Sequence, residues 1–231
     1  FAQDPTGERQ TAREFVRHAI AIGAILLDPE SGFTLNSGRK SPYFFKADLF
    51  NTGQSMGLLA DAYAAVLYPH LDVGVRTVVY GPPYKGTLLA PAIVAALWNE
   101  YGVDAGFASS RKEAKDHGDG GVMLGHELAG AAVHFADDVI SSGKSIEEAI
   151  ALVRSRGGQP SGCIIALDRQ ERAREGSLSG SAMFLQKYGI PVRSAATRDD
   201  VIAVLEEDGS AIPLGPATLP AILAYRDQYG V

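Results

Sequence analysis

The chain has 231 residues, 46% of them hydrophobic, which is enough to bury a full core, and we expect a single domain over residues 1–231. Its 21 Lys and Arg against 27 Asp and Glu give a formal net charge of -6, which disfavours a protein that coats nucleic acid. Cys163 is the only cysteine, which excludes an internal disulfide and a thiolate zinc site. Because the sequence shows neither a membrane-length apolar run nor a signal peptide, we expect a cytoplasmic protein.

Hydrophobic periodicity indicates helices and strands that alternate along most of the chain. An amphipathic helix is predicted over residues 11–27, and residues 33–45 are typical of two short strands joined by a Ser-Gly turn. Further strands are predicted at 76–80, 105–108, 162–167 and 192–196, with helices at 54–67, 85–100, 178–188, 199–207 and 217–229. Residues 109–121 are predicted to form a polar loop. This alternation favours an α/β fold with a mostly parallel central sheet flanked by helices, and ligands at the carboxyl ends of its strands.

The segment Tyr80-Gly-Pro-Pro-Tyr-Lys-Gly-Thr87, here called the Gly-Pro-Pro loop, follows a predicted strand and opens a predicted helix. Its ordinary interpretation is a rigid turn with Lys85 as a surface charge. The functional interpretation places main-chain N–H groups and Lys85 around a diphosphate, with the lysine acting as a point charge. The residues alone leave both interpretations open.

Residues 109–121, here called the lid segment, include Arg111-Lys-Glu-Ala-Lys-Asp-His-Gly-Asp-Gly-Gly121. Charged loops are usually solvated surface. The glycines of this segment could nonetheless serve as hinges of a lid that closes over a ligand. Four donors that can carry positive charge could surround a polyanion: Arg111, Lys112, Lys115 and His117. The acidic residues among them would limit non-specific anion binding.

An apolar run from Ala131 ends in two adjacent carboxylates, Asp137 and Asp138, and a helical pattern begins at Ile146. We call residues 137–145 the acidic turn. An isolated Asp pair would often supply a helix cap and a solvated charge. The Ser and Gly residues that follow would let main-chain N–H groups approach a phosphate at the helix start, while the carboxylates could bond sugar hydroxyls or face a metal. The pattern therefore indicates a site for a phosphorylated sugar.

Two aromatic residues and one arginine are candidates for a second ligand site. By default Phe44 and Phe45, in the predicted hairpin, would join the core, and Arg169, in Leu-Asp-Arg-Gln-Glu-Arg, would be an ordinary surface residue. The planar fork of Arg169 would nonetheless suit a carboxylate better than a lysine does.

From about residue 33 to residue 172 these motifs occur in the order and spacing of the orotate phosphoribosyltransferases, a family of type I phosphoribosyltransferases. Gly-Pro-Pro-Tyr-Lys-Gly resembles the family's diphosphate loop, and Arg-Lys-Glu-Ala-Lys-Asp-His-Gly resembles its mobile catalytic loop. Asp-Asp-Val-Ile-Ser-Ser-Gly resembles its loop for phosphoribosyl diphosphate (PRPP), and the C-terminal residues are similar to its closing helix. The resemblance implies a type I phosphoribosyltransferase fold with a mobile lid at 109–121 and a small hood, formed by about residues 1–50 and C-terminal elements.

The implied reaction joins orotate to PRPP, forming orotidine 5′-monophosphate and releasing diphosphate, a step of de novo pyrimidine (UMP) biosynthesis. The implied cofactor is Mg²⁺, held mainly through PRPP and not by protein ligands. In the family the lid completes the site of a partner subunit, so the resemblance also implies a homodimer, without a nucleic-acid or membrane partner.

The resemblance also implies roles for individual residues. By motif match the catalytic residues are Lys115, His117, Asp137 and Asp138. The residues implied to bind PRPP are Tyr84, Lys85, Arg111, Lys112, Lys115, His117, Asp137, Asp138, Val139, Ile140, Ser141, Ser142, Gly143, Lys144 and Ser145. Those implied to bind orotate are Phe44, Phe45, Ser141 and Arg169.

Two departures from the family pattern keep other functions open. Asn36 stands where many members have a PRPP-binding lysine, and Lys144 where the family commonly has a threonine that bonds the 5′-phosphate. A PRPP-sensing regulator with a weakened site would fit these changes, although the acidic balance disfavours a nucleic-acid binder. Another type I phosphoribosyltransferase, for purine salvage, would share the acidic turn but not this lid segment. A dinucleotide-binding enzyme is set aside because no Gly-x-Gly-x-x-Gly turn follows the first sheet strand.

Overall fold

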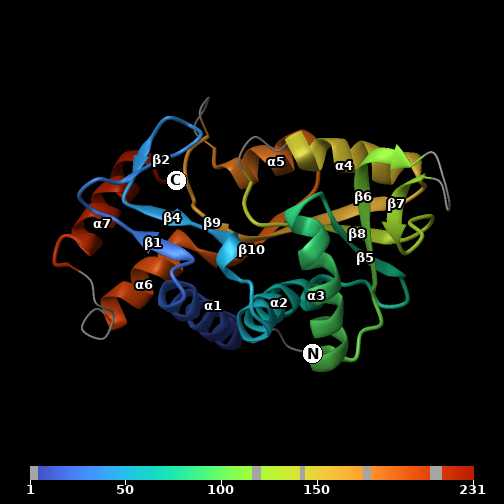
Figure 1. The fold of residues 1–231 in the computed structure, drawn as a ribbon, viewed down its shortest axis with the longest axis horizontal. Coiled ribbons are helices and arrows are strands. Elements are labelled where there is room, and N and C mark those ends of the chain that lie inside the picture. The colour runs from blue at the N-terminus through green and yellow to red at the C-terminus, as the bar shows by residue number, and fades with distance from the viewer. Residues whose placement is uncertain (1–4, 116–120, 141–143, 174–177, 209–214) are drawn as a thin grey trace.

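The computed structural model describes the main chain of residues 5–115, 121–140, 144–173, 178–208 and 215–231. Side chains are described for residues 11–111, 123–140, 146–173, 178–207 and 215–231. These residues form a central sheet with helices on both faces and a group of short strands at one end (Figure 1). No helix within these ranges is long and apolar enough to cross a membrane.

The central sheet has six strands: β5 (Thr77–Gly81), β6 (Gly106–Lys115), β7 (Gly121–Gly125), β8 (Ala132–Asp137), β9 (Gln159–Asp168) and β10 (Val192–Thr197). Their order across the sheet is β10-β9-β8-β5-β6-β7, and neighbouring strands are parallel except for β6 with β7. The ends of β5, β6, β8 and β9 therefore lie along one edge, which we call the carboxyl edge. The predicted fold class, a mostly parallel sheet flanked by helices, is confirmed.

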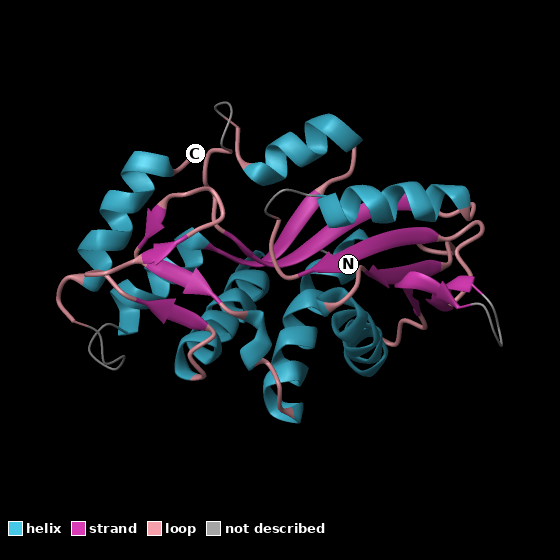
Figure 2. Cartoon of the chain, turned by 45° about the horizontal axis from the view of Figure 1, so that its top comes forward, coloured by secondary structure: helices cyan, strands magenta, loops and turns pink. Residues whose placement is uncertain are grey.

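Five helices cover the sheet: α1 (Pro5–Ala21), α2 (Gly53–Leu67) and α3 (Lys85–Tyr101) on one face, and α4 (Lys144–Ser155) and α5 (Gly180–Tyr188) on the other (Figures 1 and 2). Successive side chains of a strand point to opposite faces. Val79 of β5 accordingly packs in the core against α2 and α3, whereas Val78 and Tyr80 pack in a second core with α4 and α5. The apolar run of β5 is thus explained by burial on both faces.

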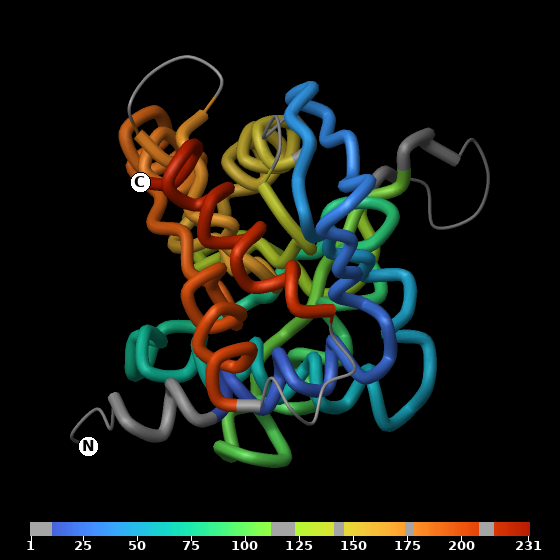
Figure 3. The backbone as a smooth tube through the Cα atoms, turned by 90° about the vertical axis from the view of Figure 1, so that its left-hand side faces the viewer, coloured from blue at the N-terminus to red at the C-terminus, as the bar shows by residue number. Residues whose placement is uncertain are grey.

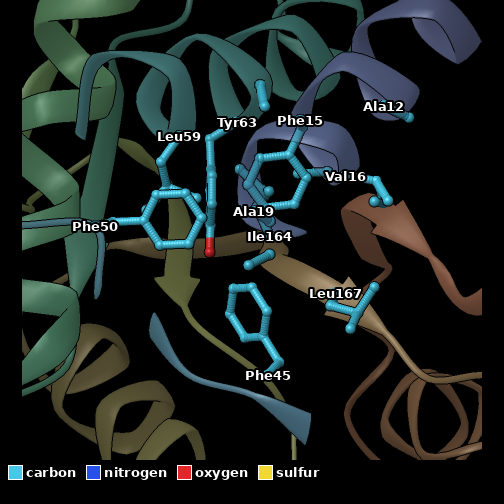
Figure 4. Close-up of a cluster of buried hydrophobic side chains, with 14 of the residues drawn as sticks. Ala12, Phe15, Val16, Ala19, Phe45, Phe50, Leu59, Tyr63, Ile164 and Leu167 are labelled. Atoms are coloured by element: carbon cyan, nitrogen blue, oxygen red, sulfur yellow. The ribbon is translucent and has the colours of Figure 1, made fainter. Parts of the chain in front are cut away.

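Aromatic residues join the N-terminal segment to the larger core (Figure 4). The ring centroid of Phe50 lies 5.7 Å from that of Phe15 in α1 and 6.0 Å from that of Phe45. Tyr63 of α2 is fully buried in the same cluster. The N-terminal elements therefore pack on the core of the sheet and do not form a separate core.

Capping residues visible in the sequence set several helix ends. Thr52 and Ser55 form a capping box at the start of α2, in which each side chain accepts a hydrogen bond from the other residue's main-chain N–H. Ser179 caps α5 in a similar way, and Gly102 and Gly189 end α3 and α5 with φ of 65° and 69°. The start of α2, at Gly53, lies within one residue of its prediction.

Short strands and two C-terminal helices lie at one end of the sheet (Figure 1), and the chain of residues 25–50 runs beside the last helix (Figure 3). The elements are β1 (Ile25–Leu27), β2 (Phe33–Thr34), β3 (Lys40–Ser41), β4 (Tyr43–Phe45), the 3-10 helix η1 (Ala47–Leu49), α6 (Arg198–Asp208) and α7 (Thr218–Tyr229). A second 3-10 helix, η2 (Tyr68–His70), instead follows α2, and the ring of Tyr68 stacks on that of Tyr101 at the end of α3. β1 pairs with β4 and β2 pairs with β3, both antiparallel. The ring of Tyr225 in α7 meets the ring of Tyr43 in β4 edge-on, with centroids 6.3 Å apart. The strands of residues 25–45 are therefore packed against the last helix of the chain.

The first helix lies six residues earlier in the chain than predicted, over Pro5–Ala21 instead of residues 11–27. It ends at Ala21 instead of residue 27, and Gly23 follows with φ of 73°. Ile25–Leu27 forms β1, whose register pairs Ile25 with Phe45. The prediction was wrong for residues 22–27 because the apolar residues there are buried in a paired strand. Over so short a run, the spacing of apolar residues does not distinguish a strand from a helix.

The lid segment is not the continuous loop that was predicted. β6 continues to Lys115, and β7 begins at Gly121, so both ends of residues 109–121 belong to an antiparallel pair. The register joins Ser110 to Met123 and Lys115 to Gly121. The prediction was wrong for these ends because pairing satisfies main-chain hydrogen bonds even where side chains are polar.

Candidate functional site

The acidic turn begins where β8 ends, and its main chain is held from two sides. The hydroxyl of Tyr63 donates a hydrogen bond to the carbonyl oxygen of Asp137 at 2.7 Å, and the N–H of Ala166 in β9 donates to that of Asp138 at 2.9 Å. The Asp137 carboxylate accepts from the N–H of Asp138, and the Asp138 carboxylate accepts from the N–H of Val139, both at 2.9 Å. The two carboxylates are thus oriented by the turn itself.

Asp137 is poised to exchange a proton near neutral pH. Burial, followed by the neighbouring charge of Asp138, raises the pKa of Asp137 from 3.8 to about 6, although the charge of Lys85 acts in the opposite direction. Burial and the same two carboxylates also raise the pKa of Tyr63 well above 10.0, so its hydroxyl remains a neutral donor. The strand end therefore combines a titrating acid with a second carboxylate.

The Gly-Pro-Pro loop meets the acidic turn through an ion pair. Lys85 Nζ lies 2.6 Å from Asp138 Oδ2 and 3.8 Å from Asp48 Oδ1. Partial burial lowers the pKa of Lys85, but the hydrogen bond and charge of Asp138 outweigh it, so the pKa lies above its usual value. The Lys85 side chain is about half exposed, so it is also accessible to a ligand.

The start of α3 lies against the sheet with no room for a side chain. A Cβ atom on Gly81 would collide with the carbonyl of Gly86, and one on Gly86 would lie 2.7 Å from the carbonyl oxygen of Ala136. Ser109 of β6 donates a hydrogen bond to the carbonyl of Gly81 at 2.7 Å and also bonds the hydroxyl of Thr87 at 2.6 Å. Glycines and small hydroxyls thus bring the ends of β5, β6 and β8 together.

The lid segment extends from the same edge. Gly81, at the end of β5, pairs with Ser109, so the part of β6 from residue 110 to residue 115 continues beyond β5. Arg111 is part-buried on this extension, and the main chain of Lys112 and Lys115 lies farther along it. Three of the four cations expected to surround a polyanion, Arg111, Lys112 and Lys115, are therefore carried on a strand that leaves the carboxyl edge.

Arg169 follows the end of β9 and is bound to the short strands of residues 40–45. Its Nη2 donates to Ser41 Oγ at 2.7 Å, its Nη1 donates to the carbonyl of Tyr43 at 3.3 Å, and its guanidinium carbon lies 4.1 Å from the centre of the Tyr43 ring. Burial lowers the pKa of Arg169, but the surrounding groups, with Tyr43 first and Glu171 next, leave it raised. Arg169 therefore remains a cation in a largely buried position.

The two aromatic candidates have different environments. Phe44 is 37% exposed, and its ring centroid lies 5.8 Å from that of Phe33. Phe45 is buried in the core beside Phe15 and Phe50. A ring of a ligand could therefore pack on Phe44, whereas Phe45 could offer a ligand its main chain only.

The remaining candidates divide between described and undescribed positions. Tyr84 is 71% exposed and follows a cis peptide bond from Pro83, while Val139 and Ile140 pack partly against the two cores. His117, Ser141, Ser142 and Gly143 lie outside the described residues, as do the side chains of Lys112, Lys115, Lys144 and Ser145. Among the described residues, no three His, Cys, Asp or Glu side chains could hold a metal ion together.

Several residues at the carboxyl edge were not singled out from the sequence. Tyr63, Ser109 and Glu171 each hold a candidate residue or loop in place. Glu171 could have been found, since it lies two positions from Arg169, but Tyr63 acts across 74 residues of chain and carries no local signal. Supporting residues of this kind are recognised only from their contacts.

Comparison with known proteins relates this geometry to one group of enzymes. A family model described as a phosphoribosyl transferase domain matches residues 49–186. An orotate phosphoribosyltransferase of Cupriavidus necator is 42% identical over 234 residues, which cover 99% of each chain. One of Aeromonas salmonicida is also 42% identical, over 220 residues that cover 95% of this chain and 98% of the relative.

Solved structures extend the comparison. The orotate phosphoribosyltransferase of Francisella tularensis aligns with a TM-score of 0.79 and 31% identity, covering 94% of this chain and 100% of that one. The enzyme of Mycobacterium tuberculosis in complex with PRPP aligns with a TM-score of 0.60 and covers 83% of this chain and 98% of that one. At 20% identity, this second likeness shows the fold alone.

Proposed function

The chain belongs to the orotate phosphoribosyltransferase family, and from that premise we propose that it transfers the phosphoribosyl group of PRPP to orotate at its carboxyl edge. The products are orotidine 5′-monophosphate and diphosphate, in the biosynthesis of UMP. The observation that carries this proposal is the contact between Lys85 and Asp138, which joins a loop suited to diphosphate to a turn suited to a phosphorylated sugar.

Charge stabilisation is the main task of the protein in this reaction. Breaking the bond between ribose C1 and diphosphate leaves positive charge on the sugar and negative charge on the leaving group. Asp137 and Asp138 would bond the ribose hydroxyls and lie near the cationic sugar. Cations and polar groups of the lid segment and the Gly-Pro-Pro loop would stabilise the diphosphate: Tyr84, Lys85, Arg111, Lys112, Lys115 and His117.

The 5′-phosphate would bind at the start of α4. The helix begins at Lys144, directly after the Ser-Ser-Gly sequence of the acidic turn. Main-chain N–H groups at a helix start are unpaired within the helix and favour an anion. Residues 139–145 would therefore hold the phosphate mainly through main-chain N–H groups and serine hydroxyls. Binding of this kind does not depend on the side chain at position 144, so it tolerates Lys144 in place of a threonine.

Orotate would bind between Arg169 and the strand that carries Phe44. A guanidinium can give two parallel hydrogen bonds to a carboxylate, and orotate has one. The exposed ring of Phe44 offers a surface for the pyrimidine, and the main chain of Phe45 and the hydroxyl of Ser141 would complete the pocket.

Mg²⁺ would be held chiefly by the substrate. Mg²⁺ prefers oxygen ligands and keeps several waters, and the two carboxylates of the acidic turn fit such a donor set as minor contributors. When bound to the diphosphate, the ion would offset the charge of the leaving group.

Because PRPP is highly charged and does not cross membranes unaided, we place the reaction in the cytoplasm.

A homodimer would complete the site. Apolar side chains on one face of α3 are exposed, with Leu88 at 67% and Trp98 at 60%, and Leu58 of α2 at 39% is also exposed. Exposed apolar area of this kind is typical of a protein interface. We propose that a second copy covers it and that each lid segment reaches the site of its partner.

A direct assay tests the function. The protein is mixed with PRPP, Mg²⁺ and orotate, and the loss of orotate absorbance is followed, with adenine or guanine in place of orotate in parallel reactions. We expect orotate alone to be consumed, with stoichiometric release of diphosphate. Consumption of a purine would assign the chain to purine salvage, and PRPP binding without any turnover would favour a sensor.

The Lys115→Ala variant tests the lid segment. Loss of a charge that acts in the transition state should lower turnover about a hundredfold or more, because the developing negative charge loses a preorganised partner. Lys187→Ala is the matched control, since Lys187 is an exposed lysine of α5 that pairs with Glu147. Steady-state rates and far-UV circular dichroism would be compared, and a variant with unchanged turnover would remove Lys115 from the mechanism.

A further inference from the structure

Three hydrogen bonds fix the guanidinium of Arg169. Besides the bonds to Ser41 and Tyr43, its Nε donates to Glu171 Oε1 at 2.7 Å. A guanidinium has five N–H donors, and these bonds use one each on Nε, Nη1 and Nη2, so donor capacity remains on the two Nη atoms. A guanidinium can give two parallel hydrogen bonds to the two oxygens of a carboxylate. The bond to Glu171 therefore determines which edge of the guanidinium is presented to a ligand.

Glu171 is itself held between two arginines. Its second carboxylate oxygen lies 3.4 Å from Arg39 Nη1, and its side chain is only 12% exposed. Arg39 also donates to the carbonyl of Arg172 at 2.7 Å and lies over the ring of Tyr229, 4.8 Å from its centre. The carboxylate thus connects Arg169 to a cation that is anchored on the C-terminal helix.

The main chain around Glu171 is tied to the end of the chain. Glu171 forms an isolated antiparallel bridge with Gly230, and the N–H of Arg172 donates to the carbonyl of Tyr229 at 2.8 Å. The N–H of Val231 donates to the carbonyl of Gln170 at 3.1 Å. Glu171 is therefore a fixed point, against which a long and flexible arginine side chain can be ordered.

The charges of this cluster suit an anionic ligand. Two guanidinium groups share one carboxylate, which leaves one net positive charge in a partly buried place. A single carboxylate, such as the one that orotate carries, would neutralise it. Removal of Glu171 would leave two adjacent unpaired cations and would free Arg169 to adopt other rotamers. Ligand binding would then have to restrict Arg169 to one rotamer, and this loss of conformational entropy would lower the affinity.

We propose that Glu171 is a positioning residue for the pyrimidine substrate, because it holds Arg169 with its Nη donors turned toward the substrate carboxylate. This inference rests on the proposed role of Arg169 in binding orotate. Glu171 acts through Arg169 and does not touch the substrate, so its effect should fall on orotate and not on PRPP.

A double-mutant cycle tests the inference with the whole 231-residue chain. Glu171→Gln should raise the KM for orotate about tenfold, equivalent to about 1.4 kcal/mol, while the KM for PRPP changes less than about twofold. Arg169→Ala should raise the KM for orotate at least as much, and adding Glu171→Gln to it should cause no further increase, because the residue to be positioned is gone. Glu147→Gln, an exposed glutamate of α4, is the matched control.

A shorter acid separates position from charge. Glu171→Asp keeps the negative charge but withdraws it by one methylene, so it should leave the KM for orotate raised if position is what matters. Full recovery in Glu171→Asp, an unchanged KM in Glu171→Gln, or additive effects in the double variant would each overturn the inference. If Arg169→Ala itself leaves the KM for orotate unchanged, the proposed role of Arg169 fails first. Thermal unfolding of each variant checks that the fold is retained.

Discussion

At the scale of single residues, burial brings the pKa of the Asp137 carboxyl group closer to neutral pH. Its pKa of about 6 follows from burial and from the adjacent charge of Asp138, and Lys85 offsets only part of both. In the folded protein the protonated form of Asp137 is therefore favoured relative to the unfolded chain. Its contribution to stability is complete below about pH 4 and is lost as the pH rises through about 6.

The Asp137→Asn variant tests this charge directly. The amide keeps an oxygen that can accept from the N–H of Asp138 but cannot ionise. The variant should nearly match the wild type in free energy of unfolding near pH 4 and exceed it by about 3 kcal/mol near pH 7. Urea unfolding across this range would measure the difference, with Asp227→Asn, an exposed acid of α7, as the control. A difference that does not vary with pH would contradict the raised pKa of Asp137.

Among elements, the junction of α3 with the sheet brings two parts of the candidate site together. Gly86 allows the helix to approach so closely that the Lys85 side chain reaches Asp138 of the neighbouring strand end. The hydrogen bonds of Ser109 add β6 to the same junction. The relative placement of the Gly-Pro-Pro loop and the acidic turn thus depends on a position where only glycine fits.

The Gly86→Ala variant should separate these two elements. The added methyl group would press on the carbonyl oxygen of Ala136, so we expect a loss of about 2 kcal/mol in the free energy of unfolding and weaker PRPP binding. Gly57→Ala in α2 is the matched control, because no atom lies within 4 Å of its added methyl group. The control should be neutral or gain up to about 1 kcal/mol. Chemical denaturation and calorimetric titration with PRPP would measure both effects. If Gly86→Ala behaved like its control, the close approach of α3 to the end of β8 would be refuted.

At the level of the whole molecule, α3 combines exposed apolar side chains with a position beside the lid segment. Exposed Leu88 and Trp98 lie on one face of α3, together with Tyr84 at the start of that helix. The lid segment leaves the carboxyl edge next to this helix, since β6 pairs with β5 and α3 follows β5. An interface through α3 would therefore bring the lid of each subunit toward the other subunit.

The Trp98→Glu variant should weaken the proposed dimer. A charge at the centre of an apolar interface loses its hydration without a partner, so the expected cost is several kcal/mol and a shift toward monomer at micromolar concentration. Light scattering coupled to size-exclusion chromatography would give the mass. Leu185→Glu, on α5 across the sheet, is the control because Leu185 is also exposed. The activity of Trp98→Glu should fall in parallel with its dimer fraction. A wild-type mass with normal activity would argue against this interface.

Much of the architecture was predictable because it is encoded in short-range patterns. Buried strands such as β5 and β8 show as apolar runs, α2 and α5 show caps, and the Gly-Pro-Pro loop and the acidic turn each stand at a strand end. Parallel strands in turn require connections that place their ends on one edge. The fold class, and the location of both candidate motifs at the carboxyl edge, therefore followed from the local sequence.

Contacts between distant segments could not be predicted in this way. Lys85 meets Asp138 across 53 residues and Arg39 meets Glu171 across 132, distances over which spacing carries no information. Whether Phe44 or Phe45 is buried depends on the register of β1 with β4, and whether the lid segment is a loop or a pair of strands depends on β7. Such outcomes follow from packing and hydrogen bonding summed over the folded chain, to which the preference of any short segment contributes only a part.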